Sequence, residues 1–344
     1  MSEMLSCPLL SPEEAQSIAI PFDDIENETN GIKTTMERYG YCIVLDTIPS
    51  TAAPSPTDNP PSSSNDIGSG PSSCRPTLQA LERSIEEDFR ELIDDNAARR
   101  CGDKKVRATV QRCVRQGVAA WPSASLRAIG KMDRLQGKGM SHGRFAWGCR
   151  THPGVRRVYE VLHGTNDLVS SCDNAFLSVG TEGVGENRLW PHVDQNDHDF
   201  SVAGHDIYQG LLYCWPSTDP RSSTTVVWPG SHRPEVYDRY MDDAFLRRRG
   251  RKRHHFTAVS MLQDPAARQR MTDGFRSHAR RVPVPSGALL LWSSRTTHQG
   301  WAGGPRLAQP VCWEPRDRRS ERAMGRKFAL AALGLPSTHS ASQG

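Results

Sequence analysis

Short apolar segments separated by turn-forming residues fill the second half of this 344-residue chain. Five of them follow one another, each bounded by Gly, Pro, Ser or Asn, at 174–179, 209–215, 224–228, 288–292 and 307–313. Strands of this length, with turns between them, are typical of an all-β sandwich or barrel. The sequence therefore predicts a fold that is mainly β in its core.

Residues 1–48 are expected to add one helix and one strand to that core. Ser11 is a good helix cap because Pro12 can occupy the first helical position and Glu14 can complete a capping box. The aromatic and β-branched residues of 39–45 then predict a strand.

Two segments separate this strand from the β-rich half. Residues 49–76 are rich in Pro and Ser and offer little apolar surface, which predicts a disordered insertion. Residues 77–139 are interpreted as a helical support region. Within them, 77–99 repeat apolar residues at helical spacing, which indicates an amphipathic helix that packs on a sheet.

The β-rich core is placed at 140–315 and a C-terminal tail at 316–344. The core is interrupted at 233–285 by an insertion that we expect to be helical and basic. Acidic residues early in 235–249 and arginines late in it match the dipole of one helix.

The composition excludes several classes of protein. A hydrophobic content of 36% is enough to build a core, and a net charge of +4 is too small for a dedicated polyanion binder. No apolar run approaches the 18 or so residues of a membrane span. Nine scattered cysteines without a Cys-x-x-Cys pair indicate reduced thiols, and the sequence has no secretory signal, so we expect a cytoplasmic protein.

A candidate metal site lies in the β-rich half. His192 and Asp194 are two residues apart and share one face of an extended chain. His298 follows at the end of an apolar strand. Two histidines and one carboxylate on one face of an ion leave three positions open, the arrangement of non-haem Fe(II) oxygenases.

Arg306, eight residues after His298, suits the same chemistry. Two neutral imidazoles and one carboxylate leave a net positive charge on Fe(II), so an anionic 2-oxoacid can bind beside O2. The far carboxylate of that co-substrate needs a permanently charged, two-pronged donor, which arginine supplies better than lysine.

The chain also resembles the phytanoyl-CoA dioxygenase family of Fe(II)/2-oxoglutarate oxygenases. The likeness covers roughly residues 140–315. It is carried by the His192-Val193-Asp194 motif, a Pro-Gly-Ser-His turn and a distal His and Arg, within the stretches 147–173, 192–194, 209–211, 227–232 and 287–306.

This resemblance implies a double-stranded β-helix, or jelly roll, with flanking helices. It implies that His192, Asp194 and His298 bind iron, that Arg306 binds 2-oxoglutarate and that Gln209 faces this co-substrate. The expected reaction hydroxylates an aliphatic C–H bond of a small organic or acyl substrate with O2, giving succinate and CO2. Because Asp194 is present, the site is similar to that of a hydroxylase and not of a halogenase.

Two features depart from this picture or stand outside it. Pro310 interrupts the strand after Arg306, so we expect that strand at a sheet edge or bulged. His232, in the Pro-Gly-Ser-His turn, is interpreted as a structural residue.

The basic run 247–253 leaves an alternative open. Such a block can serve nuclear import or nucleic-acid contact, although a solvated helix end is the simpler interpretation. The alternative is a jelly-roll binding protein that uses this run on nucleic acid and lacks oxygenase activity. A third hypothesis is a cupin-like metalloenzyme that does not use 2-oxoglutarate.

Overall fold

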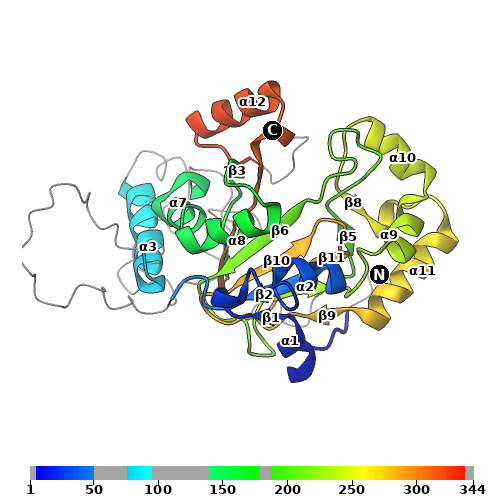
Figure 1. Cartoon of the computed structure of the whole chain (residues 1–344), viewed down its shortest axis with the longest axis horizontal. Helices are drawn as coiled ribbons and strands as arrows, with labels where there is room; N and C mark the ends of the chain where they lie inside the picture. Colours follow the sequence, from blue (N-terminus) through cyan, green and yellow to red (C-terminus); the bar gives the residue numbers. More distant parts are fainter. Residues whose placement is uncertain (1–4, 50–75, 95–139, 179–186, 338–344) are drawn as a thin grey trace, which may run out of the picture.

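The computed structural model describes residues 5–49, 76–94, 140–178 and 187–337 (Figure 1). The predicted disordered insertion and residues 95–139 of the support region lie outside the described residues. No helix among the described residues has both the length and the hydrophobicity needed to cross a membrane.

Two β-sheets form the centre of the fold, with helices around them (Figure 1). The six-stranded sheet has, in order, β1 (Ala19–Ile20), β2 (Tyr41–Val44), β10 (Leu289–Ser293), β6 (Tyr208–Tyr213), β12 (Arg306–Pro310) and β4 (Phe176–Ser178). The five-stranded sheet has β8 (Thr257–Ala258), β5 (His192–Val193), β11 (His298–Trp301), β7 (Thr224–Val227) and β9 (Arg280–Arg281). A separate pair joins β13 (Trp313–Pro315) to β3 (Leu168–Ser170).

All neighbouring strands run antiparallel except β1 and β2. From β4 to β12 the chain alternates between the sheets, apart from β8 and β9 of the insertion: β4, β6, β10 and β12 belong to the six-stranded sheet, and β5, β7 and β11 to the other. The predicted mainly β core with flanking helices is confirmed, since each of the five apolar segments overlaps a strand, and the sheets of that core are largely antiparallel.

The helices pack on the outer faces and at the ends of the sheets (Figure 1). They are α1 (Pro12–Ile18), α2 (Ile32–Tyr39), α3 (Leu78–Asp94), α7 (Arg144–Arg150), α8 (Pro153–His163), α9 (Pro234–Met241), α10 (Ala244–Arg251), α11 (Pro265–His278) and α12 (Glu321–Ala332). The capping box at Ser11 and the amphipathic helix after Thr77 are both confirmed, as α1 and α3.

Strand alternation divides the core into two layers. On β6, Leu211 and Tyr213 face inward and join residues of the other strands in one apolar cluster, which includes Val227 of the five-stranded sheet. Leu212 faces outward and joins a second cluster with side chains of α3, α7 and α8. Burial of each aliphatic or aromatic side chain stabilises the folded state by roughly 1.5–3 kcal/mol relative to leaving it exposed. The period-two pattern thus fixes which face of each strand meets the other sheet.

The insertion 233–285 differs from its predicted form. Where one helix was expected, α9 and α10 are separated at Asp242 and Asp243. The Asp243 side chain accepts from the N–H groups of Phe245 and Leu246, so it caps a new helix. The insertion also supplies β8 and β9, so it is not helical throughout.

The C-terminal segment and β12 also differ from expectation. The predicted tail contains α12, whose cap is Ser320. Strand β12 lies inside its sheet, between β6 and β4, although it ends in Pro310. The Leu307 carbonyl accepts from the N–H of Cys214, just past β6, and the Val311 N–H donates to the Gly210 carbonyl of β6. The Pro310 nitrogen therefore points to the opposite side, beyond the last residue that pairs with β4. The ladder therefore loses no bond there.

A buried histidine makes the fold sensitive to acid. Burial, assisted by the charge of Arg318, lowers the pKa of His163 to about 4. In the unfolded chain this group binds a proton near pH 6.5. Since the unfolded state then holds more protons, we expect the free energy of unfolding to fall by about 2–3 kcal/mol as the pH drops from about 6.5 to about 4.

Thermal melts of the wild type and of His163→Phe across this pH range check the expectation. Because phenylalanine cannot titrate, the variant should lose stability less steeply on acidification, even if it starts from a lower melting temperature. If the melting temperatures of the two proteins fell equally steeply with pH, His163 would not be the group that makes the fold sensitive to acid.

Candidate metal centre

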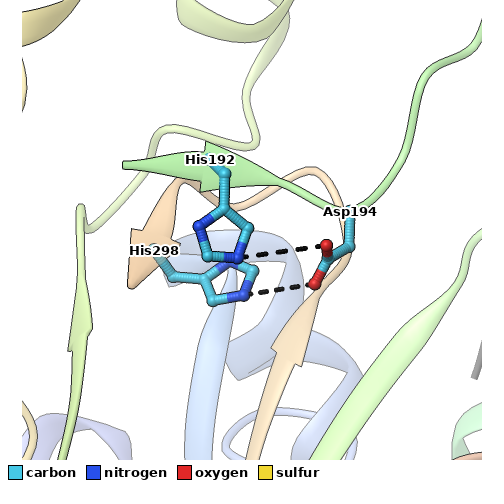
Figure 2. Close-up of side chains that lie close together, drawn as sticks. All are labelled: His192, Asp194 and His298. Atoms are coloured by element: carbon cyan, nitrogen blue, oxygen red, sulfur yellow. Dashed lines mark ion pairs between the residues drawn. The ribbon is translucent and has the colours of Figure 1, made fainter. Parts of the chain in front are cut away.

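Three side chains, two from the five-stranded sheet and one from the residue just after β5, point toward one another (Figure 2). The Nε2 atom of His192 lies 3.9 Å from Oδ1 of Asp194, and Nε2 of His298 lies 3.3 Å from Oδ2. One ligand atom from each residue lies within 4.8 Å of the other two. Both histidines are buried and Asp194 is slightly more open. The predicted triad is thus brought together.

Strand pairing explains this convergence. Strands β5 and β11 are antiparallel neighbours, and His298 stands directly opposite His192 in their register. Asp194 is two residues beyond His192, and its N–H donates to the Ser294 carbonyl at 3.0 Å. Side chains two apart on a strand share a face, so the carboxylate returns to the side that carries both imidazoles.

Each imidazole is held so that one particular nitrogen faces the triad. His192 Nδ1 lies 3.2 Å from the Trp190 carbonyl, and His298 Nδ1 lies 2.9 Å from the Thr296 carbonyl. A carbonyl can only accept, so each Nδ1 must carry the proton in these bonds. In the neutral ring, Nε2 is then the nitrogen that presents a lone pair toward the triad, as a metal ligand must.

Aromatic rings enclose the two imidazoles. Trp190 stacks on His192 with ring centroids 4.4 Å apart, and Phe256 contacts the same imidazole at 4.9 Å. Trp292 lies against His298 at 5.3 Å. These contacts restrict rotation of the rings, so little motion remains to be lost when an ion binds.

Gln209 contacts the triad directly. It lies on β6, and its Nε2 donates to Oδ2 of Asp194 at 2.8 Å and to Oγ of Ser294 at 3.3 Å. This contact orients the carboxylate. The sequence interpretation gave Gln209 a different role, facing a co-substrate, which stays a prediction.

We expect Gln209→Leu to weaken metal binding about tenfold, because a partner that orients a metal ligand is worth roughly 10–100-fold in affinity. Gln309→Leu is the matched control, since this buried glutamine of the same sheet donates to the backbone carbonyls of Asp173 and Pro310. Titration with Co²⁺ compares the two variants. Equal affinities would show that the Gln209 contact does not orient Asp194.

Arg306 lies between the two sheets. It is buried at the start of β12, its guanidinium lies 4.5 Å from the Phe176 ring centroid, and Nη1 donates to the Thr224 carbonyl across the core at 3.4 Å. The predicted cation is therefore directed into the space between the sheets.

Other candidates have structural contacts. His232 donates from Nε2 to the Glu37 carbonyl at 2.9 Å, which agrees with its interpretation as a structural residue. The basic run 247–253 ends α10 and continues past it, and Arg247 forms an ion pair with Asp242. The six cysteines of the described residues are all buried and free. The sequence interpretation overlooked Ser294 and Arg295, although both lie in the segment that leads to His298.

No known family profile matches this chain. A curated relative, the Ava biosynthesis cluster protein O of Aspergillus versicolor, is 26% identical to it over 205 residues. That alignment covers 58% of this chain and 64% of the relative. The match therefore spans less than two thirds of that protein.

Solved structures similar to this one include Fe- and 2-oxoglutarate-binding proteins. The non-heme alpha ketoglutarate dependent epimerase SnoN from nogalamycin biosynthesis is 12% identical, with a TM-score of 0.38 over 85% of this chain and 82% of SnoN. EctD from S. alaskensis with bound Fe is 12% identical, with a TM-score of 0.43 over 93% of this chain and 82% of EctD. Both TM-scores lie below 0.5.

Proposed function

We propose that this protein is an Fe(II)- and 2-oxoglutarate-dependent oxygenase that hydroxylates an aliphatic C–H bond of a small organic or acyl substrate. The observation that carries the proposal is the convergence of His192, Asp194 and His298, with both Nδ1 atoms bound to carbonyls. A site of two imidazoles and one carboxylate is the ligand set of non-haem Fe(II) oxygenases.

The proposal includes a double-stranded β-helix. The alternation of strands between the two sheets from β4 to β12, apart from β8 and β9 of the insertion, supports it. The inward-facing cluster, in which side chains of β6, β10 and β12 meet Val227 of β7, supports it as well.

The residues present fit an iron ion. Two neutral nitrogen donors and one carboxylate suit Fe(II) and leave positions for other ligands. The three groups also lie close enough together to share one ion, since Nε2 of His298 lies 3.3 Å from Oδ2 of Asp194. When bound, iron with 2-oxoglutarate and O2 supplies the oxidising power for hydroxylation, with succinate and CO2 as co-products.

Arg306 is the proposed anchor for 2-oxoglutarate. A guanidinium offers five donors in a planar fork, and two of them can bind the far carboxylate together. Its burial between the sheets strengthens this contact, since water screens a buried pair less than an exposed one.

The remaining task of the protein is to position the substrate and exclude water. Trp190 is suited to this task because one face stacks on His192 while the side chain is 42% exposed. It is the proposed apolar wall against which the substrate rests near the metal.

The test measures succinate formed by the iron-loaded protein from 2-oxoglutarate and O2, over a panel of candidate substrates. We expect 2-oxoglutarate consumption above that of the Asp194→Ala variant, which controls for iron in solution. Equal rates for the two proteins across the panel would contradict the proposal.

A further inference from the structure

The turn between β10 and β11 holds both ends of the loop that follows Asp194. The Ser294 carbonyl accepts from the Asp194 N–H at 3.0 Å, and the Ser294 N–H donates to the Ile207 carbonyl at 2.8 Å. We call residues 195–206 the metal loop. Both ends of the metal loop therefore lie beside Ser294.

Arg295, the next residue of the turn, crosses the metal loop with its side chain. Nε donates to Oδ2 of Asp197 at 3.0 Å, Nη1 to Oδ1 of Asp206 at 2.8 Å and Nη2 to the His205 carbonyl at 3.2 Å. One planar guanidinium thus joins the beginning of the loop to its end. Its side chain is 20% exposed, so these charge-assisted bonds are partly shielded from water.

A second set of bonds reinforces the same closure. Gln195 donates from Nε2 to Oδ1 of Asp197 at 2.6 Å and to the His205 carbonyl at 2.9 Å. The Tyr237 hydroxyl donates to the Gln195 carbonyl at 3.0 Å, and its ring centroid lies 5.8 Å from Cζ of Arg295. Arg295 and Gln195 therefore converge on the same acceptors, Asp197 and His205.

The turn that carries Arg295 also contacts the other half of the metal site. The Thr296 carbonyl accepts a hydrogen bond from Nδ1 of His298, and Oγ1 of Thr296 donates to the Gly40 carbonyl at 2.8 Å. The turn between β10 and β11 therefore orients His298 directly and also holds the metal loop, which follows Asp194.

We propose that Arg295 is a positioning residue for the metal site: it closes the metal loop and so fixes the carboxylate of Asp194 opposite the two imidazoles. This inference rests on the proposed function. Without the guanidinium, Asp197 and Asp206 lose their shared cation, and the chain next to Asp194 gains conformational freedom. Binding of a metal ion must then order that chain, which weakens affinity.

Co²⁺ titration of the full chain tests the proposal, with melting temperatures measured on the same samples. We expect Arg295→Ala to bind Co²⁺ about tenfold more weakly, as for other partners outside the ligand set. Arg295→Lys should lie between this variant and the wild type, because it keeps the charge but cannot reach three acceptors as a fork does. The visible spectrum of bound Co²⁺ should also change in the alanine variant, because it reports the ligand geometry.

Arg281→Ala is the matched control. Arg281 is also partly buried and donates to two carbonyls, Nε to Cys7 at 2.8 Å and Nη1 to Pro220 at 2.5 Å, but it contacts neither the metal loop nor the triad. We expect this variant to lose stability while its Co²⁺ affinity and spectrum stay those of the wild type.

A double variant sharpens the test. If Arg295 acts through Asp197, Arg295→Ala combined with Asp197→Asn should bind Co²⁺ no more weakly than Arg295→Ala alone. Should the alanine variant not fold, Arg295→Lys and Asp197→Asn carry the comparison.

The outcomes separate the two proposals. Unchanged affinity and spectrum in the Arg295 variants, with only a lower melting temperature, would overturn the positioning role and leave the oxygenase proposal standing. A wild-type protein that does not bind Co²⁺ would instead contradict the proposed function.

Discussion

Replacing Asp194 by alanine is expected to abolish tight metal binding and, with it, all turnover of 2-oxoglutarate. Asp194 is the only anionic member of the triad, and Oδ2 is also the acceptor for Gln209. Even partners outside a ligand set are worth roughly 10–100-fold in metal affinity, so loss of a ligand should cost more than about 100-fold. Metal content after dialysis and succinate formation measure the effect.

Asp194→Asn makes this test sharper, because asparagine keeps the shape of the side chain and removes its charge. We expect the asparagine variant to fold as the wild type does, to keep a contact with Gln209 and still to bind metal weakly. An asparagine variant with wild-type metal affinity would show that the carboxylate is not a ligand, whatever the fate of the alanine variant.

Replacing Arg306 by alanine should produce the second large effect, this time on the co-substrate. Truncating one partner of a buried charged pair typically costs 2–5 kcal/mol, so we expect 2-oxoglutarate affinity to fall by roughly two orders of magnitude. Arg306→Lys should recover part of it, since a point charge replaces a fork. Equilibrium binding of 2-oxoglutarate to the Co²⁺-loaded protein measures both variants without oxidation.

The Arg306 variants also discriminate between two kinds of metalloenzyme. Arg306 contacts Phe176 and the Thr224 carbonyl across the core and is not one of the three proposed ligands, so we expect metal affinity to stay within a few-fold of the wild type. Unchanged 2-oxoglutarate affinity in Arg306→Ala would instead favour a cupin-like metalloenzyme that does not use this co-substrate.

Much of the core follows from the sequence because strand alternation is local. The apolar run around Leu211 and the spacing from His192 to Asp194 both depend on the two-residue period of a strand, which involves only neighbouring residues of the sequence. The same locality explains the confirmed capping box at Ser11, since its partners lie within one helical turn.

The parts that could not be predicted depend on distant pairings. The register that places His298 opposite His192 cannot be read from the sequence, and neither can the contact that Gln209 makes with Asp194 from the other sheet. The break between α9 and α10 was missed because two adjacent aspartates were assigned to a helix dipole, although Asp243 is a cap. Arg295 gave no sequence signal of its own, since its three acceptors come from the far side of a loop.

The most direct test of the proposed metal site is a crystal structure of the iron-loaded protein with 2-oxoglutarate, grown without O2 and recorded at the iron absorption edge. We expect one anomalous peak about 2 Å from Nε2 of His192, an Asp194 oxygen and Nε2 of His298. We also expect density for the co-substrate that reaches from the ion to the Arg306 guanidinium. A peak that lacks any one of the three ligands, or a co-substrate bound away from Arg306, would contradict the proposed site.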